Sequence, residues 1–172
     1  MKSKLLLLLV PFIILTGCDK VKDAAAITVD TTLKNNIPVT VPAAKSTAAV
    51  SFSKSQDLSL ADNTDLSKYL SKIDQIDLSN VVITITGLTA GQTINSISLD
   101  VAGVGNVFTQ ANITMSLNNS FTPTVSATIL ASMGTKLKAD KKLTFTVSGN
   151  ASGAMTFTVG CNLTAKVKVF TI

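Results

Sequence analysis

A long alternation of apolar and polar residues near the end of the chain constrains the fold most strongly. From Met155 to Val169, every second residue is apolar for eight positions. Successive side chains of a β-strand point to opposite faces, so this pattern predicts a strand with one buried face. At about 3.3 Å per residue the run would span about 50 Å. We therefore expect a bend or bulge near Gly160, with the second half of the run crossing to another sheet.

Shorter alternating runs occur through the rest of the chain and predict further strands. These runs cover residues 27–31, 37–42, 48–53, 81–87, 97–103, 107–117 and 143–148. Pro38 and Pro42 suit an edge strand, because proline cannot donate a ladder hydrogen bond. The pair Asn35-Asn36 predicts a turn, and residues 149–153 predict a five-residue hairpin loop.

Two segments follow a helical period instead. Residues 65–73 carry an apolar stripe at helical spacing, with Asn63 or Thr64 as the expected N-cap. The stripe consists of Leu66, Tyr69, Leu70 and Ile73, which gives Tyr69 a core role. Residues 125–139 have a second helical face, although Gly134 interrupts it at a cost of about 1 kcal/mol relative to alanine.

Together these elements predict a mainly β fold, a two-layer antiparallel β-sandwich with one or two short helices. Clean alternation with outward threonine and serine fits antiparallel sheets that have one solvated face. Seven to nine strands in one domain of ordinary size are typical of a sandwich, with a closed barrel as the alternative. We expect the helices to cover an open end or face of the sheets.

The composition excludes several kinds of chemistry. The chain has no histidine, arginine, glutamate or tryptophan: its 15 basic residues are all lysine and its 10 acidic residues are all aspartate. Ser-His-Asp and Cys-His catalysis are impossible, and the commonest transition-metal ligand is missing. The net charge is too small to indicate nucleic acid binding. We therefore expect no enzyme activity, no cofactor and no catalytic or metal-binding residues.

The N-terminal segment has the anatomy of an export signal. Lys2 and Lys4 precede an apolar run from Leu5 to Leu15, which is too short to cross about 30 Å of hydrocarbon as a helix. The run ends in the sequence Leu15-Thr16-Gly17-Cys18.

These four residues resemble the lipobox of bacterial lipoproteins. The resemblance implies cleavage before Cys18 and attachment of fatty acyl chains, such as palmitate, to its thiol and new amino group. Residues 1–17 would then be a signal peptide, 18–25 a tether and 26–172 the sandwich domain. The alternative is an ordinary signal peptide with a chance cysteine.

An acylated Cys18 places the protein in the cell envelope, lipid-anchored to a bacterial membrane. Two or more acyl chains hold a protein firmly, since each buried CH₂ contributes about 0.8 kcal/mol. The outer membrane, facing the periplasm or the surface, is favoured over the inner membrane. Asp19 follows the cysteine, a residue that favours inner-membrane retention in enterobacterial lipoproteins only, so the leaflet stays open.

Few other residues suggest a site. Cys161 lies in the long apolar row, so we expect a buried side chain rather than a reactive thiol. The Gly103-Val104-Gly105 sequence predicts a turn rather than a phosphate loop. Two groups of aspartates are candidate sites: Asp57, Asp62 and Asp65 as calcium ligands, and Asp74 with Asp77 as a hydrolytic pair.

A group of lysines surrounds one aspartate near the predicted second helix. It consists of Lys136, Lys138, Lys141 and Lys142 around Asp140. These lysines predict either a solvated helix end or a patch that faces anionic headgroups or polysaccharide.

Three functions follow from the sequence. The first is a lipid-anchored envelope protein with a non-enzymatic binding or structural role, whose partner is an unidentified envelope protein, glycan or hydrophobic ligand. The second is a carrier of lipid or another hydrophobic ligand in a cleft between the sheets and helices. The third is an aspartate-based hydrolase.

Overall fold

Eight strands and three short helices make up the part of the chain that the computed structural model describes, residues 25–43, 49–115 and 119–171. The strands are β1 (Ala26–Val41), β2 (Val50–Ser59), β3 (Ile73–Thr86), β4 (Thr93–Val101), β5 (Gly105–Thr114), β6 (Ser120–Phe121), β7 (Lys142–Ala151) and β8 (Met155–Phe170). The helices are the 3-10 helices η1 (Leu60–Asp62) and η2 (Ser67–Lys72) and the α-helix α2 (Ala127–Asp140). None of these helices is long and apolar enough to cross a membrane.

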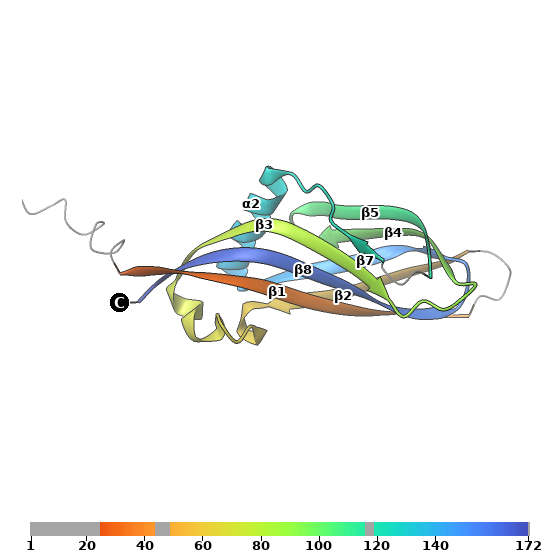
Figure 1. Cartoon of the computed structure of the whole chain (residues 1–172), viewed down its shortest axis with the longest axis horizontal. Helices are drawn as coiled ribbons and strands as arrows, with labels where there is room; N and C mark the ends of the chain where they lie inside the picture. The colour runs from red at the N-terminus through yellow and green to blue at the C-terminus, as the bar shows by residue number, and fades with distance from the viewer. Residues whose placement is uncertain (1–24, 44–48, 116–118, 172) are drawn as a thin grey trace, which may run out of the picture.

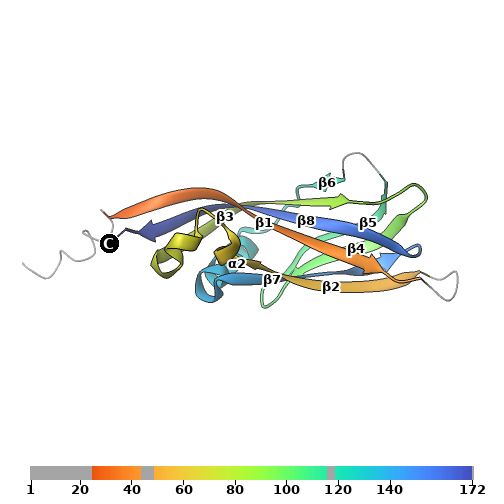
Figure 2. The same ribbon diagram turned by 90° about the horizontal axis from the view of Figure 1, so that it is seen from below.

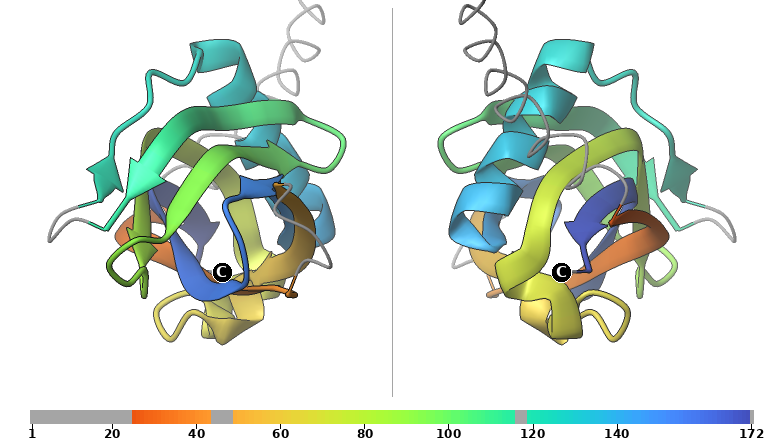
Figure 3. Two further views of the ribbon diagram at one scale, coloured as in Figure 1. Left: turned by 90° about the vertical axis from the view of Figure 1, so that its right-hand side faces the viewer. Right: turned by 90° about the vertical axis from the view of Figure 1, so that its left-hand side faces the viewer.

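The strands form two four-stranded antiparallel sheets that pack as a sandwich (Figures 1 and 2). Sheet A has the order β1-β8-β3-β6, and sheet B has the order β2-β7-β4-β5. The inward side chains of both sheets form one apolar core. Helix α2 contacts β3 of sheet A and β7 of sheet B, and Figure 3 shows it along one side of the sandwich. The predicted two-layer β-sandwich is therefore confirmed.

Strand β8 is a central strand of sheet A, between β1 and β3. It pairs with β1 over its whole length without a register shift and pairs with β3 on its other side. The predicted bulge near Gly160 and the crossing to another sheet are therefore wrong, and β8 curves gradually instead (Figure 1). A side chain at Gly160 would collide with the hydroxyl of Thr84, so the glycine permits close approach of a neighbouring strand.

The predicted turn at Asn35-Asn36 is also wrong, because both residues lie in the middle of β1. Asn35 pairs with Cys161 and Asn36 pairs with Gly160. Sixteen consecutive pairings with β8 outweigh the local turn preference of two asparagines. Within sheet A, β1 has β8 as its neighbour and forms one edge, which confirms the edge position that Pro38 predicted.

Strand β3 begins eight residues before the predicted strand, at Ile73 rather than Val81. Its register against β8 shifts between Ile73 and Gln75 and again between Leu78 and Asn80. Each shift moves the buried residues to the other sequence parity. The inward residues of β3 are Ile73, Ile76, Leu78, Val81, Ile83 and Ile85. The two shifts break the alternation that the sequence analysis relied on.

Residues 149–153 are not a hairpin loop. Strand β7 continues to Ala151, which pairs with Val50 on one side and Ile94 on the other. The connection from β7 to β8 is residues 152–154, and it passes from sheet B to sheet A. Strands β4 and β5, by contrast, form a true hairpin within sheet B.

Strand β5 is shorter and less regular than predicted. It ends at Thr114, Met115 is 55% exposed, and Leu117 lies outside the described residues. Val107 and Phe108 are both buried, because the register against β4 shifts at this point. A bulge therefore explains why two consecutive residues of β5, Val107 and Phe108, both face the core.

The first predicted helix is shorter than expected and has 3-10 geometry. Leu66 is buried just before η2, whereas Ile73 begins β3 and pairs with Val169. The Asn63 carboxamide oxygen accepts hydrogen bonds from the amides of Asp65 and Leu66 at 3.0 and 3.1 Å, so Asn63 caps the turn that leads into η2.

The second predicted helix is confirmed as α2, with Ser126 as its N-cap. The Ser126 hydroxyl accepts a hydrogen bond from the amide of Ile129 at 3.3 Å. Gly134 faces sheet A, and a Cβ atom there would collide with the carbonyl oxygen of Ile76. The glycine that weakens the isolated helix thus lets α2 pack directly against β3.

We expect Gly134→Ala to destabilise the protein by about 2 kcal/mol, because overpacking against a backbone carbonyl outweighs the gain in helix propensity. Gly153→Ala is the matched control. It has open space around its Cβ position, so its effect should stay within about 0.5 kcal/mol. Urea unfolding measures both, and equal stabilities of the two variants would contradict the proposed contact.

Candidate functional site

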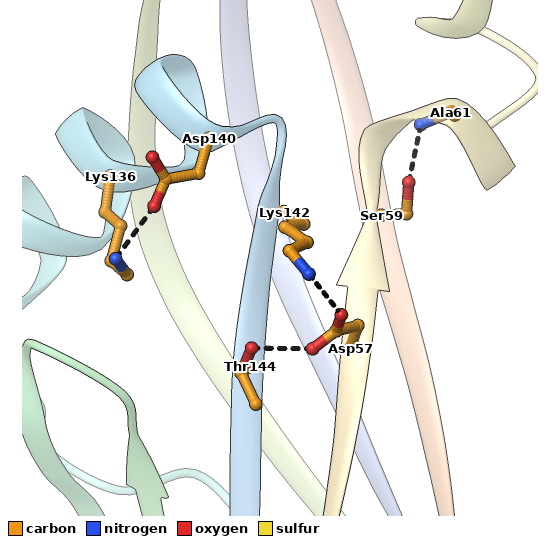
Figure 4. Close-up of polar contacts among 7 residues, drawn as sticks. All are labelled: Asp57, Ser59, Ala61, Lys136, Asp140, Lys142 and Thr144. Carbon is orange, nitrogen blue, oxygen red and sulfur yellow. Dashed lines mark hydrogen bonds and ion pairs between the residues drawn. The ribbon is translucent and has the colours of Figure 1, made fainter.

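The four lysines near the end of α2 each have a separate partner. Lys136 pairs with Asp140 within the helix at 2.8 Å (Figure 4). The Lys141 ammonium donates a hydrogen bond to the carbonyl oxygen of Lys138 at 2.6 Å. The lysines therefore do not converge on one point, and the structure places them at a largely solvated helix end.

Lys142 joins β7 to β2 through Asp57. Its ammonium lies 2.7 Å from one Asp57 oxygen, and the Thr144 hydroxyl donates to the other at 2.6 Å (Figure 4). The hydrogen bond from Lys142, followed by that from Thr144, lowers the pKa of Asp57. The hydrogen bond to Asp57 in turn raises the pKa of Lys142. Both side chains are substantially exposed, so this contact is a surface ion pair.

Asp74 joins three elements. It lies in β3, 3.8 Å from the Lys138 ammonium of α2 and 3.6 Å from the Lys168 ammonium of β8. Asp77 accepts instead from the Gln75 amide at 2.8 and 2.9 Å. The two aspartates considered as a hydrolytic pair thus belong to a strand rather than to a loop, and they bind different partners.

The aspartates considered as calcium ligands are also dispersed. Asp57 is on β2 with Lys142, whereas Asp65 accepts from the Thr31 hydroxyl at 3.2 Å. Asp62 ends η1. Within residues 25–43, 49–115 and 119–171, no three acidic or cysteine side chains gather closely enough to hold a metal ion.

The outer face of sheet B carries polar side chains that hydrogen-bond to one another. The Asn106 carboxamide donates to the Ser98 hydroxyl at 2.7 Å and to Asp100 at 3.2 Å. Ser55 and Thr146 share a hydrogen bond of 2.9 Å across neighbouring strands. These bonds hold hydroxyl and carboxamide groups in fixed positions over the sheet.

A buried polar residue escaped the sequence analysis. Asn35 is only 4% exposed and sits opposite Cys161 inside the sandwich, where its Nδ2 atom has no acceptor among the described residues. Its position in the sequence could have revealed it, since Leu33, Ile37 and Val39 share its parity and are buried. An unpaired buried amide costs about 1–3 kcal/mol.

Cys161 is fully buried and is a free thiol, as predicted. Burial raises its pKa to about 12. It is therefore a small core residue with almost no thiolate at neutral pH.

A shallow hollow of about 830 Å³ lies on the outer side of α2, beside the turn between β4 and β5. It is lined by Gly103, Ala127, Thr128, Ala131, Ser132, Thr135, Lys136, Ala139 and Asp140. Gly103 and Gly105 both have positive φ angles, 74° and 126°, which confirms the predicted turn. The hollow has no lining residue from η2 and does not lie between the sheets.

Cys18, the predicted lipidation site, lies outside the described residues. The described part of the chain begins at Ala25. The carbonyl oxygen of this residue accepts hydrogen bonds from the Thr171 amide and hydroxyl at 2.9 and 2.6 Å. The predicted anchor segment therefore joins the sandwich beside the end of β8.

Comparisons with known proteins give no functional assignment. No family model matches the chain, and no curated protein matches it. Among solved structures, a chain of Desmodium yellow mottle tymovirus is similar with 13% sequence identity and a TM-score of 0.34. The match covers 98% of this chain and 95% of that chain. A similarity this weak supports no conclusion about what the protein does.

We expect Cys161 to resist alkylation in the folded protein. With a pKa of about 12, about one thiol in 10⁴ is ionised at pH 8, and the core also excludes the reagent. Iodoacetamide labelling followed by mass spectrometry should be at least about 100-fold slower before unfolding than after. A cysteine introduced by Ser53→Cys on the exposed face of β2 is the control. Comparable native rates at the two positions would show that the core opens.

We expect the carboxyl of Asp57 to titrate below an ordinary aspartate, and Lys142→Met to raise its pKa. Because the folded pKa lies below the unfolded one, the ion pair stabilises the protein above the unfolded pKa of about 3.9, and this stabilisation is lost as the pH falls. Carboxyl NMR measures the titration. Lys54→Met, on the same strand, removes the same charge and should leave Asp57 unchanged; equal shifts in both variants would refute a local cause.

Proposed function

We propose that this chain is a lipid-anchored lipoprotein of the bacterial cell envelope, fastened to the membrane through acylated Cys18. Its sandwich then serves a non-enzymatic binding or structural role. The observation that carries the proposal is the sequence Leu15-Thr16-Gly17-Cys18 after a short apolar segment. This sequence supports export to the cell envelope and attachment to its membrane. The binding or structural role belongs to the sandwich domain.

The arrangement of polar groups supports binding or structure rather than catalysis. Asp57 and Asp74, which were candidates for chemistry, are held by lysines at the surface. The composition supplies no histidine, arginine or glutamate. The ordered hydroxyl and carboxamide groups on sheet B suit a surface that contacts another molecule through hydrogen bonds.

The two alternatives gain no support from the described residues. A hydrophobic carrier needs an apolar cleft lined by both helical segments, whereas the hollow beside α2 is shallow and partly polar. A hydrolase needs two aspartates in one concave site, whereas Asp74 and Asp77 bind different partners. We therefore retain the non-enzymatic lipoprotein as the proposal.

Metabolic labelling with a clickable fatty acid tests the anchor. We expect the natural protein to carry the label and to sediment with membranes, because acyl chains on Cys18 hold it there. Cys18→Ser should lose the label and leave the membrane fraction. Cys161→Ser is the matched control, since this thiol is buried, and it should keep the label. An unlabelled natural protein, or label retained by Cys18→Ser, would contradict the proposal.

A further inference from the structure

The chain leaves the sandwich at an end that also carries the last residues of β8 and η2. The Ala25 carbonyl accepts from Thr171, and the Thr171 carbonyl accepts in turn from the Lys72 ammonium at 3.4 Å. Figures 1 and 2 show η2 and the C-terminal end of the chain near the start of β1. Lys72 is therefore fixed beside the point where the predicted anchor segment begins.

This end of the molecule has exposed cations. Lys68 and Lys72 both lie on η2 and are exposed. The Lys68 ammonium lies 5.0 Å from the centre of the Tyr69 ring, and Lys72 donates to a carbonyl. Neither ammonium pairs with a carboxylate of a described residue. Their charge is available to a partner outside the chain.

The carboxylates of this region lie further from the chain exit or are already neutralised. Asp74 comes directly after Ile73, the first residue of β3 that pairs with β8, and its carboxylate is bound by two lysines. Asp30 and Asp77 flank Lys166 in a later row. Asp65 is bound to Thr31, which is six residues along β1 from Ala25, or about 20 Å at 3.3 Å per residue. Among the described residues, positive charge therefore dominates nearest to the exit.

Apolar and aromatic side chains accompany these lysines. Ile27 is 42% exposed, and Tyr69 and Phe170 are half-buried. The Lys168 ammonium lies 5.8 Å from the centre of the Phe170 ring. Aromatic rings with one apolar and one polar side, together with lysines, are typical of the headgroup region of a bilayer.

The predicted anchor restricts how far this end can be from the membrane. Seven residue steps join Cys18 to Ala25, and even a fully extended chain of that length spans about 25 Å. An attached domain therefore stays beside the bilayer, and the end at which the chain enters lies within that distance of it.

Resting on the proposed lipid anchor, we propose that this end is a membrane-contact surface that binds anionic lipid headgroups. We call it the anchor-proximal surface; it consists of Ile27, Lys68, Tyr69, Lys72 and Phe170. Its two lysines contact the headgroups of the leaflet that holds the acyl chains. The sandwich consequently stands on its end, with the outer faces of both sheets turned to the solvent.

Amine labelling of the full lipidated protein tests this orientation. The protein is reconstituted in vesicles of phosphatidylcholine with phosphatidylglycerol, acetylated with an amine-reactive reagent and analysed by mass spectrometry. We expect Lys68 and Lys72 to be labelled about fivefold more slowly than in detergent micelles, matching about 1 kcal/mol for each lysine at an anionic surface. Lys34, on the outer face of sheet A, and Lys54, exposed on the edge strand β2 of sheet B, should react equally in both.

Each outcome separates the surface from the anchor. If the protein floats with vesicles after an alkaline wash but Lys68 and Lys72 react as in detergent, the anchor stands and the anchor-proximal surface is refuted. Slow labelling of Lys34 or Lys54 would show that the sandwich lies on its side, which also refutes it. Protection that persists in phosphatidylcholine alone would overturn the assignment to anionic headgroups. A protein that fails to float contradicts both proposals.

Discussion

The fold depends on the pairing of β8 with strands on both of its sides. Its eight inward residues are all buried, so one strand supplies a continuous apolar ridge along the interior. A buried strand needs a partner for every backbone donor and acceptor. Strand β1 pairs with all sixteen residues of β8, and β3 pairs with most of the opposite side. The length of β8 therefore sets the length of sheet A.

This constraint explains two departures from the sequence-based expectations. The turn expected at Asn35-Asn36 would have left the middle of β8 without a neighbour, and β1 continues through it instead. Strand β3 likewise begins at the residue expected to end the first helix, because Ile73 is already paired with Val169. In both places a local preference of short range was outweighed by hydrogen bonds to a strand more than ninety residues away.

Regular alternation was enough to predict the fold class and the buried face of the C-terminal run, and the prolines predicted the edge position of Pro38, but the run was not expected to stay in one sheet as a single strand. It failed where bulges change the parity of buried residues, as at Leu78 and Asn80, since a bulge has no reliable signature in a single sequence. The sequence also did not reveal which sheet each strand joins. Residues 149–153 were predicted to form a hairpin loop, although the strands on either side lie in different sheets. For the candidate site, the sequence supplied the lysines and aspartates. Which of them pair depends on tertiary packing.

The charged residues are distributed unevenly along the long axis of the sandwich. Toward the chain exit, Asp74 pairs with lysines from α2 and β8, whereas Lys68 and Lys72 pair with no carboxylate of a described residue. The far end is different: residues 36–41, 84–99 and 148–160 contain no charged side chain. Among the described residues, the charges that attract a partner over a distance therefore lie toward the anchored end rather than on these stretches. A molecule that binds these uncharged stretches would be recognised by hydrogen bonds to hydroxyl and carboxamide groups and by shape. Such binding is insensitive to ionic strength, because salt screens interactions between charges.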